Sequence, residues 1–194
     1  MWWTSVVRIR GSVAEGTGVF VGPRHVLTAL HVIQTEEGEL TEADAIFVSQ
    51  RHGPRITLPA VAVRVLEDWE SNPGLRDLAV IQVPMLVGAG LPVAMDYGAE
   101  HAEHAVAVYG YPSPLPAEGS EGVYYSGHTR RAGNTLRSAD LRVDHGVSGG
   151  PLLIDSAGVV KVVGIVTARS TDPGQEIAVG LPLLSATFGR LFDA

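Results

Sequence analysis

One short stretch of the chain places a serine between glycines, where its hydroxyl could act as a nucleophile. Residues 144–151 read Asp-His-Gly-Val-Ser-Gly-Gly-Pro, with Ser148 near the centre. Acyl transfer by a serine needs two backbone N–H groups aimed at one oxygen, and Gly146 and Ser148 could supply them. Gly146 carries no side chain into that space, while Gly149 and Gly150 allow the turn that follows. The same residues also occur in ordinary loops, so the interpretation depends on a base and an acid elsewhere.

A histidine and an aspartate upstream of the serine are candidates for these two roles. His31 ends the sequence Leu-Thr-Ala-Leu-His, and an imidazole can both take and return a proton near neutrality. Asp77 precedes an apolar run and could hold the imidazole in one tautomer. His25, in a hairpin-like turn, and Asp68, followed by a loop sequence, are the rivals. An aspartate before a strand also commonly serves as a turn or cap residue.

Together these segments resemble the chymotrypsin/trypsin-like serine peptidases, and among them the bacterial trypsin-like peptidase domains. The matching motifs are Gly-x-Ser-Gly-Gly-Pro around Ser148, Leu-Thr-Ala-x-His ending at His31, and Asp-apolar-Ala-apolar starting at Asp77. The order His, Asp, Ser is also the order of that family, and the resemblance covers residues from about 5 to 184. It implies a serine endopeptidase with these three residues as the catalytic triad. The oxyanion hole would then be formed by the N–H groups of Gly146 and Ser148, and the reaction would pass through an acyl-enzyme.

Two departures from the family pattern separate this chain from the animal digestive and clotting enzymes of the family. Val147 stands where the zymogen-activated animal enzymes carry an aspartate, and there is no Ile-Val-Gly-Gly start. We therefore expect no activation by N-terminal cleavage. The chain also has no cysteine, whereas the animal digestive and clotting enzymes depend on disulfides.

The resemblance also identifies candidate substrate-binding residues. Arg142, six residues before the serine, would lie at the bottom of the S1 pocket, where it excludes tryptic specificity and favours acidic or small P1 residues. Arg142 stands between the apolar residues Leu141 and Val143, and this alternation is equally typical of a side chain that faces water. Thr167, Ala168 and Arg169 would offer backbone groups to an extended peptide, and Arg169 could narrow the pocket.

Many short apolar runs broken by Gly, Pro and Asp predict an all-β fold. The resemblance implies two six-stranded antiparallel β-barrels, one in residues 1–90 with His31 and Asp77 and one in residues 91–194 with Ser148. A linker is expected near 84–104, and near-helical spacing predicts a short C-terminal helix at 183–192. The runs are 7–10, 17–22, 26–28, 45–49, 57–66 and 78–83, then 105–110, 122–128, 135–143, 151–154, 159–168 and 176–180.

Composition narrows the class of partner. The 194 residues carry a net charge of −7, which argues against nucleic acid and an anionic membrane surface as partners. The resemblance to serine peptidases implies a protein or peptide substrate. No stretch approaches the roughly 20 apolar residues that a membrane span needs. Arg8 and Arg10 interrupt any apolar signal core, so we expect a cytoplasmic protein if Met1 is the native start, and a secreted one if a leader was removed.

No cofactor or metal is expected. His101 and His104 have helical spacing, but two histidines without a third placed ligand are usually surface residues. The alternative to an enzyme is a catalytically silent or partner-activated trypsin-like domain that acts as a protein-binding module of a larger signalling or defence protein. That alternative would involve further domains or an activating partner. Intact His31, Asp77, Gly146 and Ser148 favour the enzyme.

Overall fold

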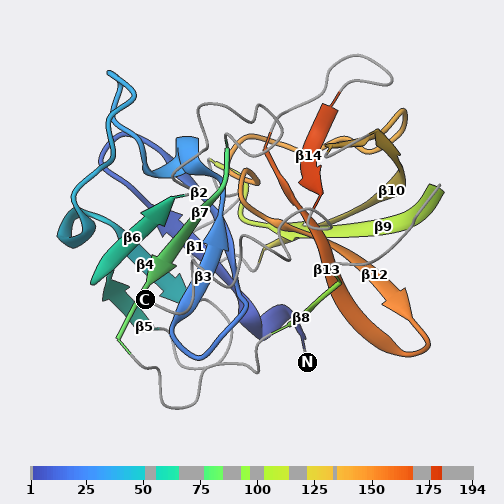
Figure 1. Cartoon of the computed structure of the whole chain (residues 1–194), viewed down its shortest axis with the longest axis horizontal. Helices are drawn as coiled ribbons and strands as arrows, with labels where there is room; N and C mark the ends of the chain where they lie inside the picture. Colours follow the sequence, from blue (N-terminus) through green and yellow to red (C-terminus); the bar gives the residue numbers. More distant parts are fainter. Residues whose placement is uncertain are drawn as a thin grey trace.

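The computed structural model describes residues 2–50, 56–65, 77–84, 93–96, 103–113, 122–132 and 135–167, and the backbone of 176–180. Strands of these residues form two curled sheets that lie side by side (Figure 1). The first sheet contains β1 to β7 and the second contains β8 to β14. Within these residues, no helix has the length and apolar character that crossing a membrane requires.

The first sheet is antiparallel throughout and has the order β5-β4-β1-β2-β3-β7-β6. Its strands agree with the runs expected from the sequence to within one or two residues at most ends. They are β1 (Val6–Arg10), β2 (Glu15–Phe20), β3 (His25–Thr28), β4 (Phe47–Gln50), β5 (Ile56–Pro59), β6 (Ala62–Val65) and β7 (Ala79–Gln82).

The expected single strand at 57–66 is wrong in one respect, because the chain bends in its middle. The N–H of Ala60 donates to the carbonyl of Ile46 at 2.8 Å, and the N–H of Val61 donates to the carbonyl of Gln82 at 2.8 Å. The two halves, β5 and β6, thus pair with opposite edges of the sheet. The bend brings these edges together and makes a six-stranded barrel, as the resemblance implied.

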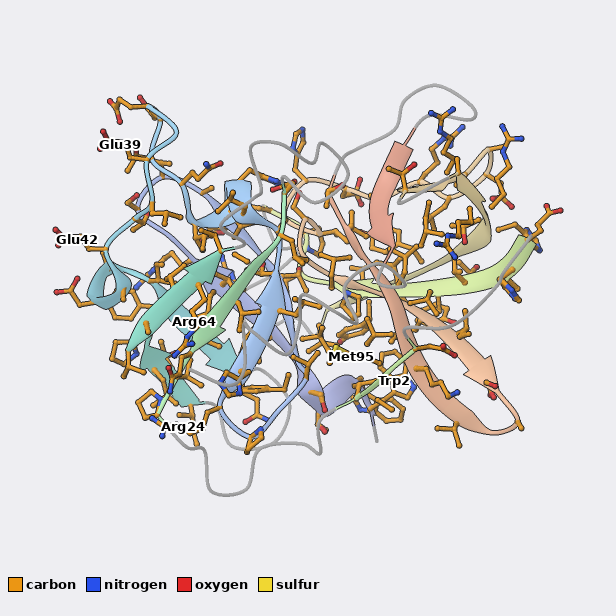
Figure 2. All side chains as sticks on the ribbon, in the orientation of Figure 1. Trp2, Arg24, Glu39, Glu42, Arg64 and Met95 are labelled. Atoms are coloured by element: carbon orange, nitrogen blue, oxygen red, sulfur yellow. The ribbon has the colours of Figure 1, made fainter. Side chains whose placement is uncertain are left out.

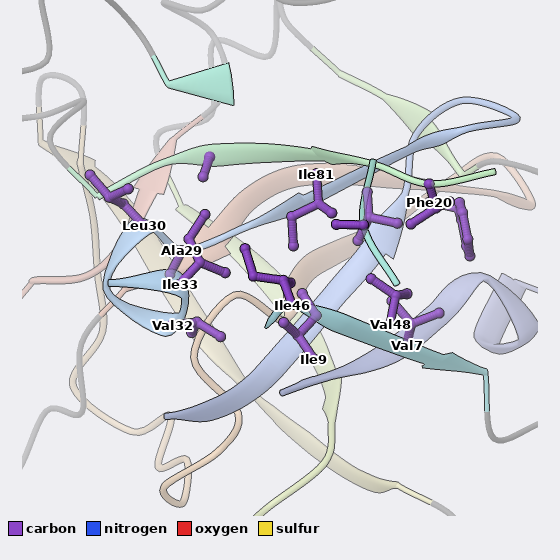
Figure 3. Packing of buried hydrophobic residues seen from close by; sticks show 14 residues of the cluster. Val7, Ile9, Phe20, Ala29, Leu30, Val32, Ile33, Ile46, Val48 and Ile81 are labelled. Carbon is purple, nitrogen blue, oxygen red and sulfur yellow. The ribbon is translucent and has the colours of Figure 1, made fainter. Parts of the chain in front are cut away.

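Alternating side chains fill this first barrel. On β1, Val7 and Ile9 are fully buried and pack with residues such as Ile46, Val48 and Ile81 (Figure 3). A strand sends successive side chains to opposite faces, so the intervening residues of β1 point away from this cluster. The barrel interior is therefore a continuous apolar core that holds the strand ends in place.

The second sheet has the order β12-β9-β10-β11-β14-β13-β8, and a pairing of β12 with β13 closes it. Six of its strands are the antiparallel barrel strands that the sequence predicted, and β8 is a two-residue parallel addition to β13. The bounds are β8 (Ala94–Met95), β9 (Glu103–Gly110), β10 (Val123–Ala132), β11 (Thr135–Arg137), β12 (Pro151–Ser156), β13 (Val159–Val166) and β14 (Glu176–Gly180).

The expected strand at 135–143 is wrong beyond residue 137. The hydroxyl of Ser138 accepts hydrogen bonds from the N–H groups of Asp140, at 3.2 Å, and Leu141, at 2.8 Å. This local turn diverts the backbone from the sheet, as serine side chains often do. The carboxylate of Asp140 then contacts His128 on β10.

A second apolar cluster joins the two barrels. Leu27 of β3 and Leu153 of β12 both belong to it, and the hydroxyl of Tyr111 donates to the carbonyl of Val6 at 3.1 Å. Trp2 packs against the same cluster, and Figure 2 shows it near β8 at the base of the junction. The expected C-terminal helix at 183–192 lies outside the described residues.

Candidate active site

A histidine and a carboxylate meet where β3 and β7 adjoin. These strands are antiparallel with Thr28 opposite Ala79, so the end of β3 lies beside the start of β7. His31 follows β3 in the short 3-10 helix η2 (Leu30–Ile33), and Asp77 precedes β7. Asp77 Oδ1 accepts the backbone N–H of His31 at 2.8 Å, and Asp77 Oδ2 lies 2.6 Å from His31 Nδ1.

This two-point contact fixes the orientation of the His31 imidazole. A carboxylate can only accept, so Nδ1 carries the hydrogen and Nε2 is the nitrogen left for other chemistry. The His31 side chain is 42% exposed and that of Asp77 is 26% exposed. The ring is therefore held by a partly buried acid and remains accessible from solvent.

His25, the rival for the role of the base, is not brought into the same arrangement. His25 lies at the other end of β3, opposite Gln82. Burial lowers the pKa of His25, and the charges of Arg64 and Arg24 lower it further. Asp68 lies outside the described residues.

Thr17 of β2 attaches the Ser148 loop to the first barrel. Its N–H donates to the carbonyl of Ser148 at 2.8 Å, and its hydroxyl donates to the carbonyl of Gly146 at 2.8 Å. The same hydroxyl accepts the N–H of Tyr111 at 3.0 Å. Thr28 of β3 completes the set by donating its hydroxyl to the carbonyl of Thr17 at 2.8 Å. Two of these bonds hold the loop against β2, and the other two fix Thr17 itself to Tyr111 and Thr28.

Gly149 brings this loop close to the chain that carries the histidine. Its φ is +82°, and a Cβ atom there would lie 2.1 Å from the carbonyl oxygen of Thr17 and 2.2 Å from the hydroxyl of Thr28. The same Cβ would lie 2.8 Å from the nitrogen of Ala29, two residues before His31. Only glycine combines this conformation with this approach.

The peptide before Gly146 has a defined orientation. The carbonyl of His145 accepts the N–H of Ser113 at 2.8 Å, and in a trans peptide the N–H of Gly146 then points to the opposite side. Gly146 has φ +83°, and a Cβ there would lie 2.6 Å from the carbonyl oxygen of Tyr111. Within the described part of the chain, the N–H groups of Gly146 and Ser148 donate to no other group. Two donors are therefore available where the sequence predicted an oxyanion hole.

Ser148 is half-buried in this arrangement. Among the residues that the structure describes, none is hydrogen-bonded to the Ser148 hydroxyl, and Nε2 of His31 is likewise without a hydrogen-bond partner. Catalytic hydrogen bonds are commonly long in unliganded enzymes and shorten when a substrate binds.

Tyr125 of β10 holds the start of the same loop. Its hydroxyl donates to Asp144 Oδ2 at 3.0 Å. Burial, followed by the hydrogen bond to Asp144, raises the pKa of Tyr125 to about 12. The phenol therefore stays protonated and able to donate across the physiological range.

The candidate substrate-binding residues are only partly described. The Arg142 side chain is exposed, and its guanidinium donates to the carbonyls of Leu141 and Ala139, each at 3.1 Å. Thr167 is half-buried and directly follows β13. Ala168 and Arg169 lie outside the described residues.

The sequence motifs did not identify the residues that support the loop. Ser113 and Tyr125 match no part of the motifs, and Thr17 occupies only the variable place of a Gly-x-Gly motif at residues 16–18. The available signal was the position of Thr17 between two glycines. One of these, Gly16, packs so closely that a Cβ there would lie 2.9 Å from the carbonyl oxygen of Ser148.

The fold and the site define a chymotrypsin-like double β-barrel with a serine loop beside a histidine–aspartate pair. A profile of the trypsin-like peptidase domain matches residues 16–165, and the chain belongs to that family. No curated protein matches the chain significantly.

Solved structures with the same fold cover almost the whole chain. Rv3671c from M. tuberculosis H37Rv, in the inactive form of a serine-to-alanine mutant, is similar with a TM-score of 0.68 and 23% identity, over 100% of this chain and 89% of that one. A Glu endopeptidase in complex with MPD is similar with a TM-score of 0.74 and 16% identity, over 97% of this chain and 91% of that one. At these sequence identities, the similarity shows that these two proteins and this chain share a fold.

We predict that Thr17→Val destabilises the protein by about 2–4 kcal/mol, because it leaves the buried carbonyl of Gly146 and the N–H of Tyr111 without a partner. Thr17→Ser keeps the hydroxyl and should cost no more than about 1.5 kcal/mol for the lost methyl group. Urea unfolding followed by fluorescence measures both changes. Equal losses for the two variants would show that packing, and not hydrogen bonding, is the function of Thr17.

We predict that Gly149→Ala prevents folding or lowers stability far more than Gly158→Ala. Both glycines have φ near the same value, +82° and +80°, so both substitutions carry the left-handed backbone cost of about 1–2 kcal/mol. The new Cβ atom would clash with Thr17 at Gly149. A Cβ atom at Gly158 would have no neighbouring atom within 4 Å. Similar melting temperatures for the two variants would contradict the close docking of the loop.

Proposed function

We propose that this protein is a serine endopeptidase that hydrolyses peptide bonds through an acyl-enzyme formed on Ser148. One observation carries the proposal: Asp77 holds both the backbone N–H and Nδ1 of His31, on the strand end against which the Ser148 loop is docked. Membership of the trypsin-like peptidase domain family supports it.

The reaction begins with the attack of Ser148 Oγ on the carbonyl carbon of the scissile bond. His31 Nε2 takes the hydroxyl proton as the new C–O bond forms, and Asp77 stabilises the resulting imidazolium. The N–H groups of Gly146 and Ser148 stabilise the oxyanion of the tetrahedral intermediate. His31 then gives its proton to the leaving amine, which departs and leaves the acyl group on Ser148.

Hydrolysis of the acyl-enzyme repeats these steps with water as the nucleophile. His31 Nε2 takes a proton from the water as its oxygen attacks the ester carbonyl, and the same two N–H groups stabilise the second oxyanion. Collapse of the intermediate breaks the bond to Ser148, whose oxygen recovers the proton from His31. The products are a free amine and a free carboxylic acid, with no other reactant than water.

We also propose that the single chain forms the active site without an activating partner protein. Ser113 and Thr17 fix the peptide planes on either side of Gly146 within the single chain. Val147 is fully buried in the apolar core of the second barrel, so it offers no charge to a freed N-terminal amine. Both features favour an active domain over the silent or partner-activated alternative.

For specificity, we propose a preference for acidic or small P1 residues, which rests on Arg142. Its exposed guanidinium, six residues before Ser148, could pair with a carboxylate. A Glu endopeptidase is among the structures with this fold. Cleavage of a peptide library, read by mass spectrometry, should show Glu, Asp, Ala or Ser before the scissile bond. Predominant cleavage after Arg or Lys would contradict the preference.

Labelling with a fluorophosphonate probe tests the catalytic proposal, because such probes react with activated serines. We predict that the protein is labelled, that Ser148→Ala is not, and that Asp77→Asn reacts about 10⁴-fold more slowly. Ser126→Ala is the matched control, since Ser126 is an exposed serine on β10, in the second barrel.

The control variant should be labelled as fast as the unchanged protein. Failure of the folded protein to react at all, with a native circular dichroism spectrum, would support the silent or partner-activated domain instead. Persistent labelling of Ser148→Ala would place the nucleophile elsewhere.

A further inference from the structure

A half-buried ion pair on β1 and β2 reaches the segment that orients the Gly146 peptide. Arg8 Nη2 lies 2.5 Å from Glu15 Oε2, and the two side chains are 26% and 32% exposed. The hydroxyl of Ser113 donates to the same Glu15 oxygen at 3.2 Å. Ser113 follows β9, so this bond joins the first barrel to the second across 98 positions of the sequence. The proposed hydrolysis uses neither Arg8 nor Glu15.

The backbone of Ser113 orients the peptide between His145 and Gly146. Its N–H donates to the carbonyl of His145 at 2.8 Å. Because the C=O and N–H of a trans peptide point to opposite sides, this bond turns the N–H of Gly146 away from Ser113. Ser113 thus has two anchored groups: its hydroxyl is held by Glu15, and its N–H holds the peptide that carries an oxyanion donor.

Gly146 cannot fix this peptide plane by itself. Its φ is +83°. A half-turn of the peptide would bring φ to about −100°, which glycine adopts as readily. The reversed peptide would direct the carbonyl of His145, instead of the N–H of Gly146, to the place of the oxyanion. A partner outside the loop must therefore select the orientation, and in the described part of the chain the N–H of Ser113 is that partner.

The segment that contains Ser113 packs directly against Gly146. A Cβ atom at Gly146 would lie 2.7 Å from the nitrogen of Ser113 and 3.0 Å from the carbonyl carbon of Pro112. Tyr111 is anchored to the first barrel through its N–H and its hydroxyl, and Pro112 continues the chain with a fixed φ. Glu15 supplies the anchor at the Ser113 end, so a shift of Ser113 would move the peptide that faces it.

Arg8 restricts the position of the Glu15 carboxylate and balances its charge. A charge-assisted bond to a guanidinium is stronger than a neutral hydrogen bond and holds the carboxylate in one place. An unbalanced carboxylate beside the loop would also oppose the negative charge that develops on an oxyanion. The ion pair is thus suited to hold Ser113 without adding a net charge at this place.

We propose that Glu15, kept in place by Arg8, is a positioning residue that acts through Ser113 to keep the N–H of Gly146 directed at the oxyanion. This role rests on the proposed acyl transfer, since that reaction forms the oxyanion. Glu15 acts at a distance from the reacting atoms: it fixes Ser113, and Ser113 fixes the carbonyl of His145 on the opposite side of the peptide.

Acylation by p-nitrophenyl acetate measures the effect on the reaction, with Ser148→Ala as the blank. Glu15→Ala should lower the maximal rate constant of acylation about ten- to hundredfold, because loss of a complete oxyanion donor costs roughly 10²–10³-fold. The half-saturating ester concentration should stay within about twofold, because this donor acts mainly in the transition state. Glu42→Gln, at an exposed glutamate that projects from the first barrel (Figure 2), should leave both values unchanged.

Further variants separate the hydrogen bond of Glu15 from its charge. Glu15→Gln keeps an oxygen that accepts the Ser113 hydroxyl, so it should retain the acylation rate to within about threefold. Glu15→Asp keeps the charge but is one methylene shorter, so it should lose as much as Glu15→Ala. Ser113→Ala should be as slow as Glu15→Ala, and the double variant should be no slower, because both residues act through one contact.

A measurement without catalysis reads the positioning directly. NMR of the ¹⁵N,¹³C-labelled protein detects the scalar coupling across the hydrogen bond from Ser113 N–H to the carbonyl of His145. The coupling should be present in the unchanged protein and in Glu15→Gln, and it should be lost in Glu15→Ala. The amide resonance of His31, whose N–H is bound by Asp77, should remain unshifted in each variant.

The two measurements distinguish failure of the enzyme from failure of the positioning role. If the unchanged folded protein is not acylated, the proposed peptidase is wrong, and the NMR coupling still decides whether Glu15 orients the peptide. A coupling that persists in Glu15→Ala would overturn the positioning role. Acylation of Glu15→Ala as fast as that of Glu42→Gln would overturn it too, as would additive effects of Glu15→Ala and Ser113→Ala. A rate for Glu15→Gln as low as that for Glu15→Ala would show that the charge, and not the hydrogen bond to Ser113, matters.

Discussion

The arrangement of the candidate active site depends on the hydrogen bonds of one buried threonine. Thr17 belongs to the first barrel, yet its N–H and hydroxyl hold the carbonyls of Ser148 and Gly146 from the second. The histidine and the aspartate also belong to the first barrel. The serine loop and His31 are not paired in one sheet. The hydrogen bonds of the loop to β2 therefore help to set its distance from His31. Thr17 therefore fixes the serine loop of the second barrel to a strand of the first barrel.

The constraint is strict because the carbonyl groups of the loop are hydrogen-bonded and the space beside Gly149 is filled. Gly149 has no room for a Cβ atom against Thr17 and Thr28, and each peptide plane near Gly146 has a hydrogen-bond partner on one side. Buried polar groups without partners are costly, so alternative loop conformations would lose several such contacts together. These contacts hold the peptide planes around Gly146 in place with Val147 at the next position.

The sequence predicted the barrels and suggested the candidate reactive residues because both leave local signals. Alternating apolar runs mark strands, and His31 and Asp77 lie in short motifs beside them. The interior bend at Ala60 and the early end of the strand at Ser138 depend on partners elsewhere in the fold, so local patterns missed them. Thr17 was missed for the same reason, since its partners lie as far as 129 residues away. The His128–Asp140 pair has no motif, because a turn brings its members together across two strands.

The central claim is that Ser148 becomes acylated with His31 as its base. The most direct measurement is mass spectrometry of the protein after brief reaction with a p-nitrophenyl acyl ester at low pH, where deacylation is slow. Peptide mapping should find the acyl group on Ser148 alone, and His31→Ala should remove it. An unmodified Ser148 in the folded protein, or acylation that persists without His31, would contradict the account.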